Sequence, residues 1–105
     1  MEVKAEAFMP PVNKGITEIS VYRTQGCSEN EIWAIGQRYV ADPGNRTLYA
    51  RGDIPVKAVH HFGLGVESDP TPHARHANIT KFPSDKSLAK LRAMELAKQA
   101  VLVIR

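Results

Sequence analysis

The chain has 105 residues, 43% of them apolar, so about 45 side chains are available for a core, which suits one ordinary domain. Charged residues make up 24%, and seven Gly with seven Pro are close to average usage, which excludes collagen and argues against disorder. Lys and Arg outnumber Asp and Glu by 14 to 11, and the pI of about 9.2 is only mildly basic. This charge alone does not identify a nucleic-acid-binding protein.

The cellular location is inferred from the N-terminal residues and from cysteine usage. The first seven residues are too polar for a secretory signal, and the longest strongly apolar run, residues 101–104, is far shorter than the roughly 20 residues that cross a bilayer. Cys27 is the only cysteine, so no intrachain disulfide can form. We therefore expect a cytoplasmic protein with no membrane partner, whose fold depends on its hydrophobic core.

Two alternating segments open the chain. Small or apolar residues alternate with polar ones over residues 3–9 and again over residues 17–22, the pattern of half-buried strands. Residues 10–15 contain two prolines and a glycine and indicate a turn. We expect an antiparallel hairpin over the first 23 residues, with residues 1–15 forming its arm or being partly flexible.

A helix start is predicted at Ser28, because Ser28 and Glu31 form the pattern of a capping box. Apolar residues follow at helical spacing until Asp42-Pro43-Gly44-Asn45, and Trp33 is expected to anchor this helix in the core. Residues 47–51 alternate again and predict a third strand. This strand would place Leu48 and Ala50 inward, and Tyr49 and Arg51 together on the opposite face.

The middle of the chain is less regular. Asp53 is expected to cap a short helix that has Pro55 in its first turn and stops at Gly63. Residues 64–66 suggest a brief strand. Residues 68–76 contain two prolines and predict an exposed loop.

The C-terminal part contains the clearest helix. Residues 77–82 are expected to be extended, and residues 85–100 have high helix propensity. One face of this helix carries small or apolar residues that permit close approach to a sheet, namely Ala89, Ala93, Leu96 and Ala100. Residues 101–104 form either a last strand or a helical extension, and we favour the strand. The expected fold is a single α+β domain over residues 1–105, a mainly antiparallel sheet packed by two or three helices.

Three short strings carry a resemblance: residues 18–23, residues 31–36, and His76-Ala77-Asn78-Ile79-Thr80-Lys81-Phe82-Pro83 before the Lys- and Ala-rich helix. Over about residues 16–100 the chain resembles a group of short bacterial proteins of uncharacterised function, which often carry Trp where Phe82 stands here. The resemblance implies a bacterial cytoplasmic setting and one compact domain. It transfers no catalytic residue.

The four histidines are the first group of candidate site residues. His60 and His61 end the predicted short helix, and His73 and His76 lie in the proline loop with Asp69. Imidazole is a common ligand of zinc, so two or three of these with Asp69 are candidate metal ligands. Consecutive histidines on a helix point about 100° apart, however, and loop histidines are often plain surface residues. We therefore expect no metal site and no cofactor.

A second group combines Tyr49, Arg51, His73, Arg75 and His76. Histidine as general acid or base, with arginine on the phosphate, suits RNA cleavage without a metal. Cys27, directly before the capping Ser28, is a weaker candidate for a nucleophile. The sequence does not show whether these side chains meet, and it leaves open whether the protein is an enzyme.

Two functions remain after these considerations. The favoured one is a non-catalytic accessory or protein-interaction domain that binds a protein partner or forms a homodimer. The alternative is a small metal-independent ribonuclease or RNA-binding protein. Catalysis would require His76 to share a concave pocket with Arg51 or Arg75, whereas an interaction domain is expected to expose a strand edge or an apolar patch.

Overall fold

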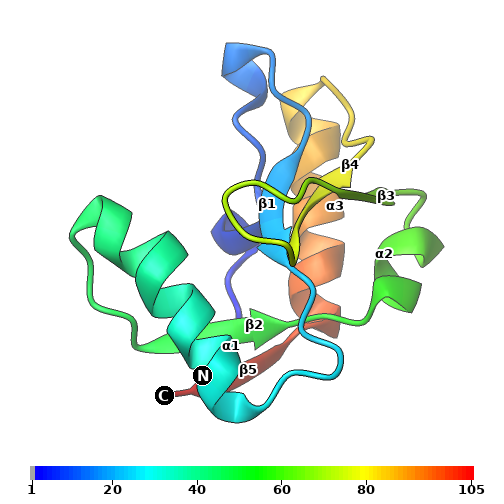
Figure 1. Ribbon diagram of the computed structural model, residues 1–105. Helices are drawn as coiled ribbons and strands as arrows, with labels where there is room; N and C mark the ends of the chain where they lie inside the picture. Colours follow the sequence, from blue (N-terminus) through cyan, green and yellow to red (C-terminus); the bar gives the residue numbers. More distant parts are fainter. Residues whose placement is uncertain (1) are drawn as a thin grey trace.

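The computed structural model describes residues 2–105 and has an α+β fold with two separate antiparallel sheets (Figure 1). The strands are β1 (Ile19–Tyr22), β2 (Ala50–Asp53), β3 (Gly65–Ser68), β4 (His76–Thr80) and β5 (Val101–Ile104). The α-helices of the described residues are α1 (Glu29–Gly36), α2 (Val56–His61) and α3 (Lys86–Gln99). One sheet has the strand order β1-β4-β3, and β2 pairs with β5 in the other. No helix within residues 2–105 is long and apolar enough to span a bilayer.

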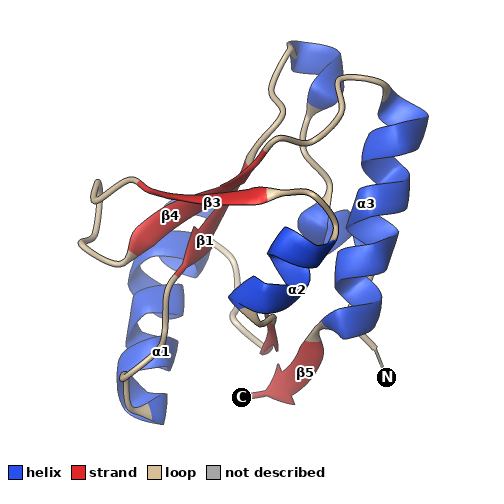
Figure 2. Ribbon diagram, turned by 90° about the vertical axis from the view of Figure 1, so that its right-hand side faces the viewer, coloured by secondary structure: helices blue, strands red, loops and turns tan. Residues whose placement is uncertain are grey.

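The core lies between the central strand β4 and the helices α2 and α3. Ile79 of β4 is 1% exposed, and α3 turns Ala89, Ala93 and Leu96 toward the same cluster. Alanine side chains let the α3 backbone come close to its neighbours, and Figure 2 shows α2 and α3 on one side of the three-stranded sheet. The predicted helix face is therefore confirmed, although Ala100 is only half-buried.

The N-terminal hairpin prediction is wrong. Residues Ala5–Phe8 form a 3-10 helix that packs against α3, and Phe8 is buried in the core. β1 pairs with β4 instead, with Ile19 opposite Ile79 and Tyr22 opposite His76. The alanine-rich first segment has low β propensity and is followed by two prolines. Burial of Phe8 against α3 therefore stabilises the chain more than strand pairing of this alternating segment would.

The predicted start of α1 is confirmed in atomic detail. The Glu31 amide donates to Ser28 Oγ at 3.2 Å, and the Ser28 amide donates to Glu31 Oε1 at 3.3 Å. A π-helical turn, Gln37–Ala41, continues the helix. Trp33, expected in the core, is only half-buried and lies beside Arg51.

The remaining predicted helices and strands are present, but several begin or end at other residues than predicted. The predicted third strand begins three residues later, at Ala50, and α2 starts after Pro55 without a side-chain cap. Asp53 is not the cap of α2, because it ends β2 and bonds to Arg51. The amide of Leu88 donates to the Asp85 carboxylate at the start of α3, and residues 101–104 form the favoured strand.

Candidate functional site

The proline loop between β3 and β4 is closed by His76. The His76 side chain is buried, and its Nδ1 lies 2.8 Å from the backbone oxygen of Asp69. The Asp69 amide in turn donates to the His76 carbonyl at 3.0 Å. A carbonyl oxygen only accepts, so the Nδ1 of His76 carries the hydrogen in this bond. His76, expected in an exposed loop, is thus the buried first residue of β4 and bonds to Asp69, the first residue after β3.

His73 belongs to a cluster of aromatic rings. The Arg75 amide donates to His73 Nδ1 at 3.0 Å, which leaves the hydrogen of the neutral ring on Nε2. The His73 ring packs edge-on against Tyr39 at 5.3 Å, and Tyr22 packs against His76 at 5.3 Å. Burial, with a smaller contribution from Tyr39, raises the pKa of Tyr22 above its usual value. The cluster thus joins the loop to β1 and to the end of the first helix.

Arg51 is held by two carboxylates. Its guanidinium makes paired 2.9 Å bonds to Glu29 and a 2.9 Å bond from Nε to Asp53, and it lies over the Trp33 ring. The pKa of Arg51 is raised, most by its hydrogen bond to Glu29 and next by its hydrogen bond to Asp53. The hydrogen bond from Arg51 also lowers the pKa of Glu29. A phosphate would have to displace these carboxylates to reach the Arg51 guanidinium.

The structure divides the predicted ribonuclease group. His73, Arg75 and His76 lie together at the loop between β3 and β4. Arg51 lies on β2, and Tyr49 before it is 74% exposed. Neither loop histidine lines the cleft that Arg51 lines.

The candidate metal ligands are similarly distributed. His60 Nδ1 lies 3.1 Å from the Leu64 oxygen, and the His61 ring packs against Phe62, so both remain on the exposed end of α2. His76 Nδ1 and a carboxylate oxygen of Asp69 are 3.6 Å apart. Across residues 2–105, no three His, Cys, Asp or Glu side chains gather closely enough to hold a metal ion.

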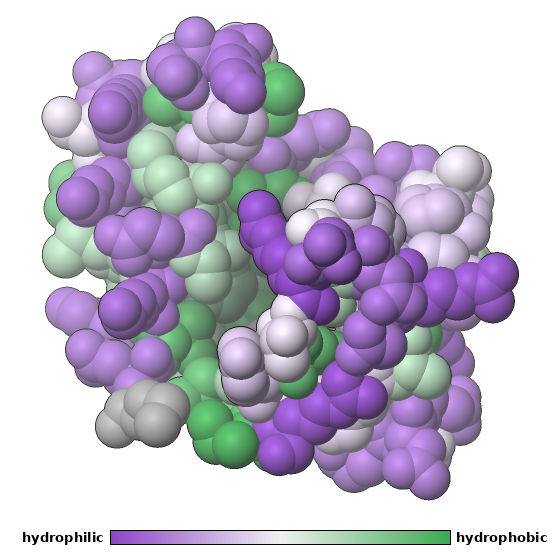
Figure 3. Space-filling model, turned by 90° about the vertical axis from the view of Figure 1, so that its left-hand side faces the viewer, coloured by the Kyte–Doolittle hydropathy of each residue, from purple (hydrophilic) through white to green (hydrophobic). Residues whose placement is uncertain are grey.

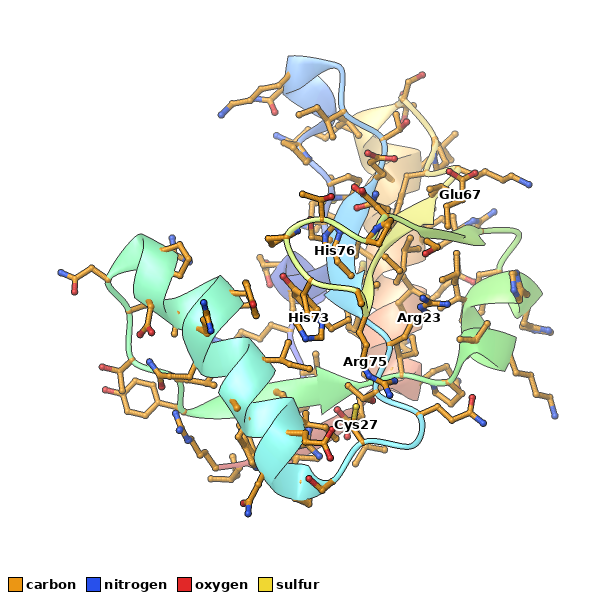
Figure 4. The ribbon with its side chains drawn as sticks, in the orientation of Figure 1. Arg23, Cys27, Glu67, His73, Arg75 and His76 are labelled. Carbon is orange, nitrogen blue, oxygen red and sulfur yellow. The ribbon has the colours of Figure 1, made fainter. Side chains whose placement is uncertain are left out.

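A pair of arginines, Arg23 and Arg75, was not recognised from the sequence. The Arg23 amide donates to the Arg75 carbonyl at 2.9 Å, which extends the β1–β4 ladder by one residue pair. The Arg75 guanidinium donates to the backbone oxygens of Arg23 and Gln25, and Arg23 Nη2 lies 3.4 Å from Ser68 Oγ. Figure 4 shows the Arg75 side chain directed away from His73 and His76, toward the turn that carries Cys27.

Neither guanidinium of this pair has a carboxylate within 4.0 Å among the described residues. The two side chains line a cavity of about 430 Å³ together with Gln25 and Ala74. Only the observed pairing of β1 with β4 reveals them as neighbours, because they are 52 residues apart in the sequence.

A larger apolar cleft of about 820 Å³ separates α1 from the strands. Its walls include Trp33 of α1, Val21 of β1 and Ala50 of β2, and Val59 and Ile79 of the core also line it. Arg23 and Gln25 line this cleft as well as the smaller cavity, so the two adjoin. Figure 3 shows a recess near the centre of one face, with hydrophobic residues at its bottom and hydrophilic residues around it.

Comparison with protein-family models, with curated protein sequences and with solved structures gives no significant match for this chain.

Proposed function

We propose that this chain is a non-catalytic protein-interaction domain of the bacterial cytoplasm that binds through the outer edge of β5, to a second copy of itself. The observation that carries this proposal is the unpaired edge of β5. In the described residues, β5 pairs only with β2, in a sheet of two strands. A two-stranded ribbon is marginally stable alone, so the addition of further strands would stabilise it.

The register identifies which backbone groups of β5 point outward. The Arg105 amide donates to the Tyr49 carbonyl, and Val103 lies opposite Arg51. Hydrogen-bonded pairs alternate along an antiparallel ladder, so Val101, Val103 and Arg105 bond toward β2. The N–H and C=O groups of Leu102 and Ile104 therefore face away from β2.

The side chains of β5 also favour association. Ile104 is 58% exposed, and Val101, which also lines the apolar cleft beside α1, is 63% exposed. Exposed strand edges are commonly protected by Lys, Pro or a bulge, whereas Val101–Ile104 contains neither charge nor proline. An apolar edge of this kind is suited to pairing with another strand.

A second copy fits this edge with two-fold symmetry. If two β5 strands pair antiparallel about Val103, Leu102 of each chain faces Ile104 of the other. The outward N–H and C=O groups of both residues then find partners across the axis. The two β2–β5 ribbons would merge into one continuous sheet, and no like charges would lie opposite each other within Val101–Ile104.

The arrangement of the predicted catalytic residues supports a non-catalytic function. His76 is buried and bonded to the Asp69 backbone, and the charge of Arg51 is matched by Glu29 and Asp53. A general acid or base must reach its substrate within hydrogen-bonding distance, and His76 lines neither cavity. The alternative function is that of a ribonuclease or RNA-binding protein.

Replacing Ile104 by proline is expected to raise the dissociation constant of the dimer about tenfold or more, because it removes an outward N–H on each side of the axis. Ile104→Thr is the matched control, since threonine is β-branched and retains the N–H. Sedimentation equilibrium over a concentration series measures the dimer constant of each protein. Circular dichroism checks that each variant is folded.

The proposal requires the native chain to dimerise and the threonine variant to dimerise better than the proline variant. A native chain that stays monomeric at high concentration would contradict it. Equal dimer constants for the two folded variants would show that another surface holds the dimer.

A further inference from the structure

We propose that the apolar cleft beside α1 binds an amphipathic anion of the fatty-acid type, with its chain in the cleft and its carboxylate on Arg23 and Arg75. Val101 of β5 lines this cleft, but the outward backbone groups through which the dimer is proposed to form belong to Leu102 and Ile104, so the ligand site does not depend on the dimer. The apolar cleft adjoins the cavity that the two arginines line.

The cleft has the size and the lining of a small-molecule site. Its volume of about 820 Å³ falls within the range of about 300–1,000 Å³ that is typical of ligand pockets. Trp33, Val21 and Ala50 form apolar walls, and the cleft reaches the buried side chains of Val59 and Ile79. An unbranched hydrocarbon chain would remove this apolar surface from water without leaving polar groups unpaired.

The arginine pair provides a place for one anionic group. Arg23 and Arg75 lie opposite each other at the end of the β1–β4 ladder, where like charges are destabilising. The carbonyls of Arg23 and Gln25 hold the Arg75 guanidinium through Nη1, so its remaining N–H groups stay available for a ligand. A carboxylate between the two guanidinium groups would reduce their repulsion and accept charge-assisted hydrogen bonds.

The other charges around the cleft direct an anion to this pair. Arg51 also lines the cleft, but its guanidinium is bonded to the carboxylates of Glu29 and Asp53. Arg23 and Gln25 line both the cleft and the smaller cavity. A single molecule can therefore place its chain in the first and its head group in the second.

The same surface is poorly suited to RNA. Single-stranded RNA is usually bound by open aromatic faces beside a basic groove, but the rings of Tyr22 and Tyr39 pack on each other and on His73. The cleft next to the arginines is apolar rather than basic. We therefore favour the amphipathic anion, and RNA binding is one outcome of the test.

Trp33 makes binding measurable, because it is the only tryptophan and it lines the cleft. Titration of the native chain with dodecanoate below its micelle concentration is expected to shift Trp33 emission to a saturating value. The double variant Arg23→Gln/Arg75→Gln is expected to weaken this binding about tenfold or more. Arg46→Gln is the matched control, because Arg46 is exposed and lines neither cavity.

Three further ligands separate the contributions of chain and charge: methyl dodecanoate, inorganic phosphate and a short single-stranded RNA. The proposal requires dodecanoate to bind more tightly than its neutral ester and phosphate to bind weakly. Equal binding of the acid and the ester, or no effect of the double variant, would overturn the role of the arginines. RNA binding that depends on Arg23 and Arg75 and is not displaced by dodecanoate would assign the pair to nucleic acid instead.

The site can be tested apart from the dimer. Ile104 does not line the cleft, so Ile104→Pro is expected to bind dodecanoate as the native chain does. Loss of dimerisation with retained binding would support two separate surfaces. Loss of dodecanoate binding in this folded variant would contradict the separation that the inference requires.

Discussion

Replacing Ile79 by alanine is expected to lower the free energy of unfolding by about 2–5 kcal/mol, the usual cost of removing a large aliphatic side chain from a core. Ile79 is 1% exposed on β4, the central strand between β1 and β3. It belongs to the cluster that joins the sheet to α3 through Leu96 and to α2 through Val59. A domain of this size has a total stability of only about 5–15 kcal/mol, so this loss is a large fraction of it.

Chemical denaturation followed by Trp33 fluorescence and by circular dichroism measures the loss. Ile16→Ala is the matched control, because Ile16 undergoes the same change while 43% exposed, and it is expected to cost less than about 1 kcal/mol. Protein concentration must be fixed in all samples because dimerisation adds apparent stability. Similar losses in the two variants would contradict the position of Ile79 at the centre of the core.

The elements that the sequence predicted well are those with local signals. The capping box at Ser28 lies within one helical turn of the amide that its hydroxyl binds. The small face of α3 repeats at helical spacing, so its burial follows from the sequence alone. The apolar run at residues 101–104 likewise formed the favoured strand.

The N-terminal segment shows where local signals mislead. The alternation of residues 3–9 is real, yet an isolated alternating pattern does not specify a partner strand. Phe8 gains more by packing in the core with Leu96 and Phe82 than a short alanine-rich strand would gain by pairing. The partner of β1 is β4, which lies more than fifty residues further along the chain, so local spacing does not identify it.

The candidate site depends on the same long-range pairing. Four histidines that are close in sequence are divided between α2 and the loop before β4. Arg23 and Arg75, which no motif connects, become neighbours only because β1 pairs with β4. The sequence thus predicts that His73, Arg75 and His76 are neighbours, but it does not predict that Arg23 faces Arg75.

Replacing His76 by alanine is expected to lower the free energy of unfolding by about 2–3 kcal/mol and to leave total RNA as intact as the native chain leaves it. The change removes the donor to the Asp69 carbonyl and the ring that packs against Tyr22. Because both ends of the proline loop meet at His76, the loop should become easier to cleave with a protease.

Two variants separate the hydrogen bond from a general effect of losing histidine. His76→Asn is expected to recover part of the stability, since the asparagine amide can donate to Asp69. His60→Ala is the control, because His60 also lies near a carbonyl oxygen but is exposed, and its loss is expected to cost less than about 1 kcal/mol. Denaturation curves, limited proteolysis and incubation with total RNA are measured on the same preparations.

The combination of readouts distinguishes a structural histidine from a catalytic one. A structural His76 predicts lower stability, a more accessible loop and no RNA cleavage by any of the proteins. A catalytic His76 predicts that the native chain cleaves RNA and that the folded alanine variant does not. That second result would replace the interaction domain with the ribonuclease, because a side chain buried against Tyr22 and bonded to Asp69 would then have to move to reach its substrate.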